Sequence, residues 1–161
     1  MQSIYPSVES SIKSLPYADK NLILTGHSRG GALAVLMAQF LYTKYADVDD
    51  EMIPDQIYTF GAPRVGDIDF YHNYDLRAQT RLFINEGDPV PTTPPTSTGF
   101  YHVHEQYLML RNSVNEVDMD QALTQSSFYD AYVRIKAGGP DFGDHSLTKG
   151  YIPNIKRNLG W

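Results

Sequence analysis

The chain of 161 residues contains no cysteine. Disulfide bonds, cysteine-ligated zinc and thiol nucleophiles are therefore excluded. Basic residues are also scarce, because 13 Lys and Arg stand against 19 Asp and Glu, for a formal net charge of −6. This balance argues against a nucleic-acid-binding protein and against electrostatic docking on anionic membranes, since both reward basic surfaces.

Long apolar runs are missing as well. The longest apolar-leaning stretch, residues 30–41, is interrupted by Gln39 and is too short to span a bilayer. Residues 1–15 lack the basic start and the apolar run of a signal peptide. We therefore expect neither a signal peptide nor a transmembrane segment, and a cytoplasmic location is favoured.

What is present is an ordinary globular composition, with 42% hydrophobic and 20% charged residues. The length suits one domain over residues 1–161. Strands are expected at residues 21–25, 56–60 and 80–85, with one or two more within 100–110, and helices at 4–15, 31–45, 69–78 and 121–137. This alternation of strands and helices predicts an α/β fold with a mostly parallel sheet and flanking helices.

The segment Gly26-His27-Ser28-Arg29-Gly30 matches the pattern G-x-S-x-G. An expected strand comes directly before it and an expected helix directly after it, which is the setting of a nucleophile elbow. Glycines two residues to either side of Ser28 would leave room for the strand and the helix to meet. The alternative is a glycine-rich turn that holds a phosphate, although the segment lacks the lysine of a Walker A loop.

A nucleophilic serine needs a base, and the base needs a carboxylate that orients it. In open α/β sheets these groups lie just past the carboxyl ends of strands. Asp88 follows the strand expected at 80–85 within three residues and is the preferred acid. Asp67 and Asp69 follow the preceding strand at greater distance and rank lower, and a turn-forming role before Pro89 is the alternative for Asp88.

The base should come late in the chain, after the acid. His145 lies near the carboxyl terminus in an expected loop and is the preferred base. His102 and His104 alternate in a strand-like run, so both are expected on one face of a sheet. They could suggest a metal site, but no third ligand lies nearby in sequence, so packing is the favoured role and no metal is expected.

Several segments together resemble the fungal-type class 3 lipases. Residues 22–34 (LILTGHSRGGALA) resemble the nucleophile segment of that family, and residues 59–67 (TFGAPRVGD) its next block. Residues 85–95 (NEGDPVPTTPP) resemble its aspartate loop, residues 100–103 (FYHV) the strand after that loop, and Asp144 with His145 its terminal histidine segment.

This resemblance implies an α/β-hydrolase fold. It makes Ser28 the nucleophile, Asp88 the acid and His145 the base, with the backbone N–H of Arg29 as one oxyanion-hole donor. It implies a lipid or small ester as substrate, and neither a metal nor an organic cofactor. Gly26, His27 and Gly30 would complete the nucleophile elbow.

The sequence also departs from the family. Arg29 stands where leucine is usual, and Tyr151 follows His145 by six residues rather than at closer spacing. Family members usually carry a long segment before the elbow, with the first strands, the lid and a second oxyanion donor, and no segment before Ser28 resembles it. The chain thus reads as the carboxyl-terminal portion of the fold. Residues 22–25 would then form an open sheet edge, which we expect a second copy, a partner chain or the helix at 4–15 to cover.

The favoured function is therefore a serine hydrolase that cleaves lipid carboxylic esters through an acyl-enzyme. The alternative is a truncated, catalytically impaired lipase-like domain that binds lipid or a partner protein. A related acyl-transfer enzyme or peptide hydrolase is a third, weaker reading, because the same three side chains serve several chemistries.

Overall fold

A computed structural model describes residues 4–15, 21–85, 87–110, 117–118 and 141–159 of the chain. The strands are β1 (Ile23–His27), β2 (Gln56–Phe60), β3 (Thr80–Asn85), β4 (Gln106–Leu110) and β5 (Val117–Asp118). The α-helices are α1 (Tyr5–Ser14), α2 (Arg29–Tyr45), α3 (Ile68–His72), α5 (Phe142–His145) and α6 (Ile152–Leu159). A π-helical turn, Leu147–Tyr151, joins α5 to α6.

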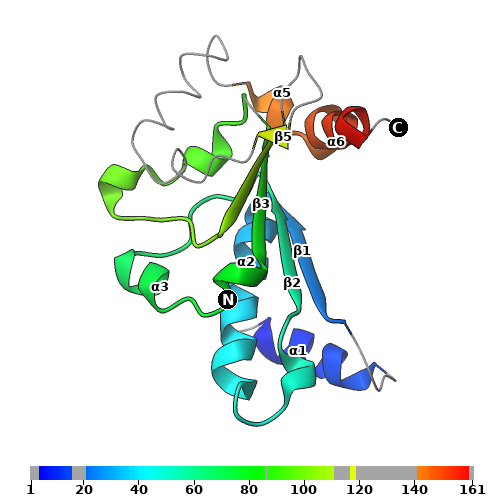
Figure 1. Ribbon diagram of the computed structural model, residues 1–161, viewed down its shortest axis with the longest axis vertical. Coiled ribbons are helices and arrows are strands. Elements are labelled where there is room, and N and C mark those ends of the chain that lie inside the picture. The colour runs from blue at the N-terminus through cyan, green and yellow to red at the C-terminus, as the bar shows by residue number, and fades with distance from the viewer. Residues whose placement is uncertain (1–3, 16–20, 86, 111–116, 119–140, 160–161) are drawn as a thin grey trace.

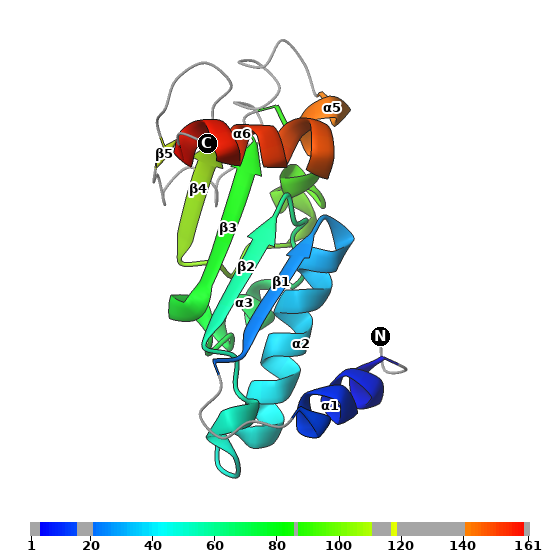
Figure 2. The ribbon, with the colours of Figure 1, turned by 90° about the vertical axis from the view of Figure 1, so that its right-hand side faces the viewer.

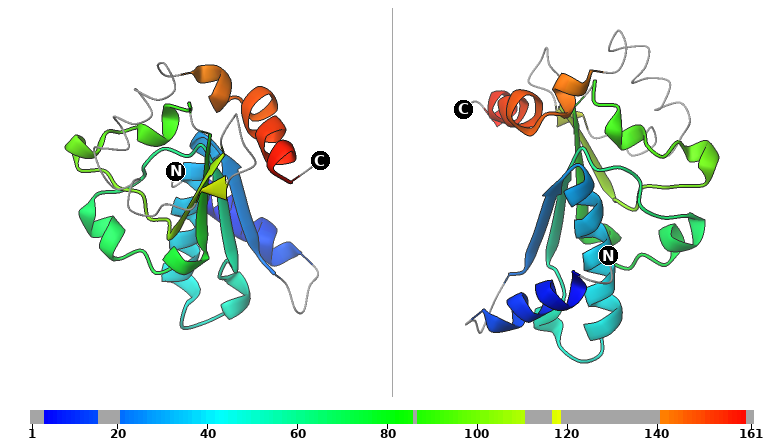
Figure 3. Two further views of the ribbon diagram at one scale, coloured as in Figure 1. Left: turned by 45° about the horizontal axis from the view of Figure 1, so that its top comes forward. Right: turned by 180° about the vertical axis from the view of Figure 1, so that it is seen from behind.

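The strands form one sheet in the order β1-β2-β3-β4-β5 (Figure 1). The first four are parallel, and β5 runs antiparallel to β4. The carboxyl ends of the parallel strands therefore lie at one end of the sheet, where α5 and α6 cross above them (Figures 2 and 3). The predicted α/β fold with a mostly parallel sheet is confirmed.

The core lies between the sheet and α2, which follows β1 directly and packs along one face (Figure 2). Side chains of β2 and β3 alternate, so that Ile57 and Leu82 are fully buried while their neighbours are half-buried. From α2, Val35 and Ala38 are fully buried in the same cluster as Ile57. Burial of such side chains supplies most of the stability of a fold of this kind.

The helix α1 packs against α2, where Ile12 joins a second buried cluster with Leu41 and Tyr45. The ring of Tyr5 stacks on that of Phe40, with centroids 4.4 Å apart. Within the described residues, no helix combines the length and the apolar character needed to cross a membrane.

The strand β1 stands at one end of the strand order. Ile23 on this strand is 53% exposed. We expected α1 as one possible cover for this edge. The helix contacts α2 and shares a cluster with Leu24 of β1, but no strand pairs with the outer side of β1 in the described part of the chain.

Two expectations about local structure need correction, and a third is not tested. The helix expected at 69–78 is the shorter α3, followed by a single 3-10 turn at Arg77–Gln79, because the side chains of Tyr74 and Leu76 turn into the core. His145 ends the short helix α5 rather than lying in a loop, since Asp141 caps that helix. The helix expected at 121–137 lies outside the described residues.

Candidate active site

Ser28 sits at the sharp turn between β1 and α2. Its backbone has φ 58° and ψ −129°, a conformation that costs free energy in a residue other than glycine and is typical of functional turns. The turn is held by the neighbouring strand, because the N–H of Ser28 donates to the carbonyl of Phe60 at 2.9 Å. The turn raises the hydroxyl of Ser28 above the carboxyl end of β1.

The glycines around Ser28 have unequal roles. A Cβ on Gly26 would lie 2.6 Å from the backbone nitrogen of Gly31, and one on Gly31 would lie 2.8 Å from Cβ of Ala62. Gly30 is exposed, and a Cβ there would meet no atom within 4 Å. The steric reason expected for Gly30 is therefore wrong, because the close approach of strand and helix falls on Gly26 and Gly31 instead.

The structure brings Ser28, Asp88 and His145 together from three separate segments. Nε2 of His145 lies 2.8 Å from Oγ of Ser28, and Nδ1 lies 2.9 Å and 3.0 Å from the two carboxylate oxygens of Asp88. An ionised carboxylate only accepts hydrogen bonds, so Nδ1 carries the proton and Nε2 is left to accept from the serine hydroxyl. Such an arrangement can pass a proton from serine to imidazole.

Asp88 is completely buried, and its carboxylate is surrounded by donors. Besides His145, the hydroxyl of Tyr151 donates to Oδ2 at 2.6 Å and the N–H of Val90 donates to Oδ1 at 2.8 Å. A buried carboxylate is tolerated only with such partners. The π-helical turn Leu147–Tyr151 lets Tyr151 reach Asp88 from six residues beyond His145, a contact that the sequence analysis did not anticipate.

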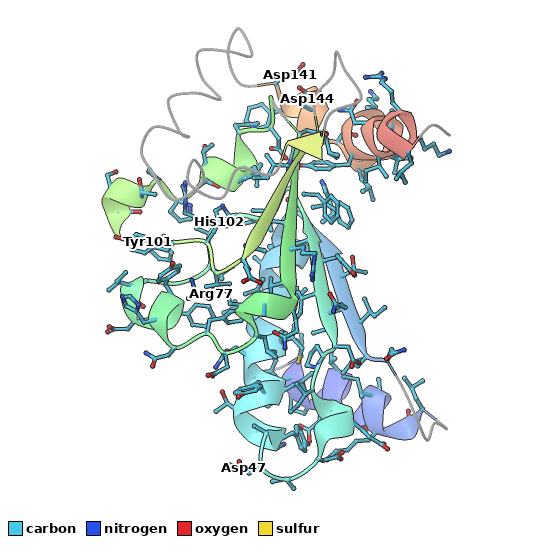
Figure 4. The ribbon with its side chains drawn as sticks, viewed as in Figure 1. Asp47, Arg77, Tyr101, His102, Asp141 and Asp144 are labelled. Carbon is cyan, nitrogen blue, oxygen red and sulfur yellow. The ribbon has the colours of Figure 1, made fainter. Side chains whose placement is uncertain are left out.

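His27 and Asn85 also contact the segment that carries His145. Nε2 of His27 donates to the carbonyl of His145 at 2.7 Å, and the two imidazole rings lie 4.7 Å apart. The side-chain amide of Asn85 donates to the carbonyl of Asp144 at 2.7 Å. Figure 4 shows Asp144 at the carboxyl end of the sheet. Sequence reasoning placed His27 only within the elbow and missed Asn85, because both contacts join residues far apart in the chain.

The loop after Asp88 is held through its backbone. Within the described part of the chain, Arg64 and His102 donate hydrogen bonds to the carbonyls of residues 91–94. The backbone N–H of Arg64 donates to the carbonyl of Thr93 at 2.8 Å, and its Nη1 donates to the carbonyls of Thr92 and Pro94 at 2.7 Å and 2.8 Å. Nε2 of His102 donates to the carbonyl of Pro91 at 2.8 Å. Both residues are buried, so the loop that carries Asp88 rests on two internal donors.

His102 and His104 do not join Ser28. Burial and the nearby positive charge of Arg64 lower the pKa of His102 to about 3, and burial lowers the pKa of His104 well below its ordinary value. Both rings are therefore neutral near pH 7. They do not alternate on a strand as expected, since His102, Val103 and His104 are all buried and all precede β4. His104 instead forms a hydrogen bond with Thr59 at 2.8 Å.

The remaining candidates lie elsewhere. Asp67 caps α3 by accepting from the N–H of Phe70 at 2.9 Å, and Asp69 lies on the same helix. Among the described residues, no group of three His, Asp or Glu side chains could hold a metal ion. Arg29 opens α2 with an exposed side chain, and its backbone N–H belongs to the first turn, where helix geometry leaves such donors free.

Comparison with known sequences gives a family match. The family described as Lipase (class 3) matches residues 1–98. A lipase of Rhizomucor miehei is 38% identical over 105 residues, which are 64% of this chain and 28% of that protein. A secreted mono- and diacylglycerol lipase of Fusarium solani is 28% identical over 148 residues, which are 86% of this chain and 41% of that protein.

Comparison with solved structures also finds lipases. A triacylglycerol lipase whose catalytic centre is described as a serine protease triad superposes with a TM-score of 0.55 at 26% identity. The match covers 80% of this chain and 52% of that structure. The chain thus spans less than half the length of the two curated relatives that it matches. The α/β-hydrolase-like fold expected from the sequence is confirmed.

Proposed function

The chain belongs to the class 3 lipase family, and from this premise we propose that it is a serine hydrolase that cleaves carboxylic esters of lipids. The single observation that carries the proposal is the unbroken line of hydrogen bonds from Ser28 through His145 to Asp88, at 2.8 Å and 2.9 Å.

In the proposed mechanism, Oγ of Ser28 attacks the ester carbonyl while Nε2 of His145 takes its proton. Asp88 keeps the imidazole in the required tautomer and stabilises its charged form. The imidazolium then gives its proton to the leaving alcohol, which leaves the acyl group on Ser28. A water molecule, deprotonated by His145, releases the fatty acid. Nucleophile, base and acid all come from the chain, so the mechanism needs no metal or organic cofactor.

The negative oxygen that forms during attack needs donors that are already in position. The backbone N–H of Arg29 follows Ser28 directly and supports this role, and the amino-terminal end of α2 adds a favourable dipole. Loss of one oxyanion donor typically lowers the rate about 100- to 1,000-fold. Turnover therefore depends strongly on how many donors surround Ser28.

The substrate class follows from the relatives. The matched proteins are described as a lipase, a mono- and diacylglycerol lipase and a triacylglycerol lipase. We propose a lipid ester as the substrate of this chain. We also propose that another strand, from a second copy or from a partner chain, pairs with the open edge of β1, because exposed edges of this kind attract further strands.

The test measures hydrolysis of p-nitrophenyl butyrate and p-nitrophenyl palmitate by the wild type, by Ser28→Ala and by Ser11→Ala. Ser11 is an exposed serine on α1 and serves as the matched control. We expect activity in the wild type and in Ser11→Ala and none in Ser28→Ala, with a fluorophosphonate probe labelling only the first two. Equal rates in the wild type and Ser28→Ala would contradict the proposal and favour a lipid- or protein-binding domain.

A further inference from the structure

Asn85 ends β3 between the segments that carry the acid and the base, and it is completely buried. Each of its polar groups has a partner. The backbone N–H donates to the hydroxyl of Tyr151 at 3.1 Å, and the backbone carbonyl accepts from the N–H of Asp88 at 3.1 Å. The side-chain amide donates to the carbonyl of Asp144 at 2.7 Å, and Oδ1 accepts from the amide of Asn154 at 3.1 Å.

These contacts reach both halves of the site. Through its backbone, Asn85 binds Asp88 and the Tyr151 hydroxyl that itself donates to Asp88. Through its side chain, it holds the carbonyl of Asp144, the residue directly before His145. A side chain that donates and accepts at the same time is needed here, which an amide provides and a carboxylate does not.

The segment around His145 is pressed closely onto Asn85. A Cβ on Gly150 would strike the carbonyl of Asp144 and would lie 2.9 Å from Nδ2 of Asn85. The next carbonyl along the chain, that of His145, is held by His27 at 2.7 Å. Two consecutive carbonyls are therefore fixed from β1 and β3, so the backbone under the imidazole has little room to shift.

We propose that Asn85 is a positioning residue that sets the placement of the His145 imidazole relative to Asp88 and Ser28. This proposal rests on the proposed function, because it concerns the same Ser28–His145–Asp88 line. Without the amide donor, the carbonyl of Asp144 would lose the hydrogen bond that fixes it from β3, and the backbone next to His145 would be free to shift. A displacement of about 1 Å at reacting groups can lower the rate about 100-fold.

The kinetic test compares Asn85→Asp with Asn73→Asp. Asn73 is a matched control, because its amide also donates to a backbone carbonyl, that of Asp69, at 2.7 Å, but on α3. We expect Asn85→Asp to lower kcat for p-nitrophenyl butyrate about 100-fold with KM unchanged, and Asn73→Asp to leave both constants unchanged. Equal kcat values in the two variants would overturn the proposal.

A spectroscopic test does not depend on turnover. The low-field proton resonance of His145 Nδ1–H, identified by its loss in Asp88→Ala, is expected to shift or broaden in Asn85→Asp and to stay unchanged in Asn73→Asp. An unchanged resonance in Asn85→Asp would overturn the proposal. If Asn85→Asp shows this response but the wild type shows no Ser28-dependent turnover, the proposed function is contradicted and the positioning role stays supported.

Circular dichroism checks that Asn85→Asp is folded. If it is not, Gly150→Ala provides the second variant, because its methyl group would collide with the carbonyl of Asp144 and crowd Nδ2 of Asn85, which disturbs the hydrogen bond between them without removing the amide. The same loss of kcat with unchanged KM is expected, and a wild-type kcat in Gly150→Ala would overturn the proposal.

Discussion

The two ends of the molecule are held together in different ways. At the carboxyl end of the sheet, Asp88 and Asn85 are completely buried, and their side chains are bound by donors and acceptors from distant segments. At the other end, α1 rests on α2 through an apolar cluster and through Glu9, which is only half-buried and forms ion pairs with Lys13 and Lys44.

This difference follows from what burial demands. A buried polar group without a partner costs free energy, so its neighbours must sit at defined positions. An ion pair in contact with solvent gains little, and a shift in its geometry costs little. Substitutions at the carboxyl end of the sheet should therefore affect function strongly, whereas those around α1 and the edge of β1 should affect association or stability mildly.

The largest effect is expected from Asp88→Asn. An amide cannot favour the required imidazole tautomer, and the equivalent change in a serine protease lowers kcat about 10,000-fold. We expect a loss of similar size in ester hydrolysis, measured as kcat. Asp67→Asn is the matched control, since Asp67 only caps α3. Comparable losses in the two variants would remove Asp88 from the site.

A strong effect on folding is expected from Gly26→Ala. The added methyl group would meet the backbone of α2, and overpacking of this kind costs about 1–3 kcal/mol. Gly30→Ala, two residues beyond Ser28, adds the same methyl group in open space within α2 and should not lower the melting temperature. Thermal unfolding followed by circular dichroism separates the two variants, and equal melting temperatures would contradict the structure of the elbow.

A moderate effect on association is expected from Ile23→Lys. If another strand pairs with the edge of β1, a charge on this edge should weaken the association, as seen by sedimentation velocity. Val48→Lys is the control, because Val48 is an exposed apolar residue beyond the end of α2. A monomeric wild type whose β1 amides exchange rapidly with solvent would contradict pairing at this edge.

The smallest effect is expected from Glu9→Gln. Hydrogen bonds from Lys44, Tyr45 and Lys13 lower the pKa of Glu9 from 4.5 to about 2. The ionised form is thus favoured by folding, so its contribution is present above pH 4.5 and is lost as the pH falls toward 2. As the pH falls from 4.5 toward 2, the melting temperature of the wild type should fall more than that of Glu9→Gln. Glu51→Gln is the control and should follow the wild type. A parallel pH dependence in wild type and Glu9→Gln would exclude this contribution.

Local patterns predicted much of this molecule. The apolar runs before Ser28 and before Asp88 indicated β1 and β3, and parallel strands bring their carboxyl ends together. The order Ser28, Asp88, His145 then sufficed to choose among the acids and histidines. The contacts of Asn85 and Tyr151 could not be predicted, because they join positions 59 to 69 residues apart and leave no periodic trace in sequence. Gly30 was misjudged because motif spacing does not reveal which side of a turn is open.

The loop that carries Asp88 is held mainly through its backbone. Arg64 and His102 bind main-chain carbonyls, which every amino acid carries alike, so their hold on this loop does not depend on which side chains it carries. The hydroxyls of Thr92 and Thr93 add a second set of bonds, because they donate to the carbonyls of Pro89 and Val90 at 2.7 Å. The protein thus anchors this loop twice, once through atoms common to every amino acid and once through the hydroxyls of two particular side chains.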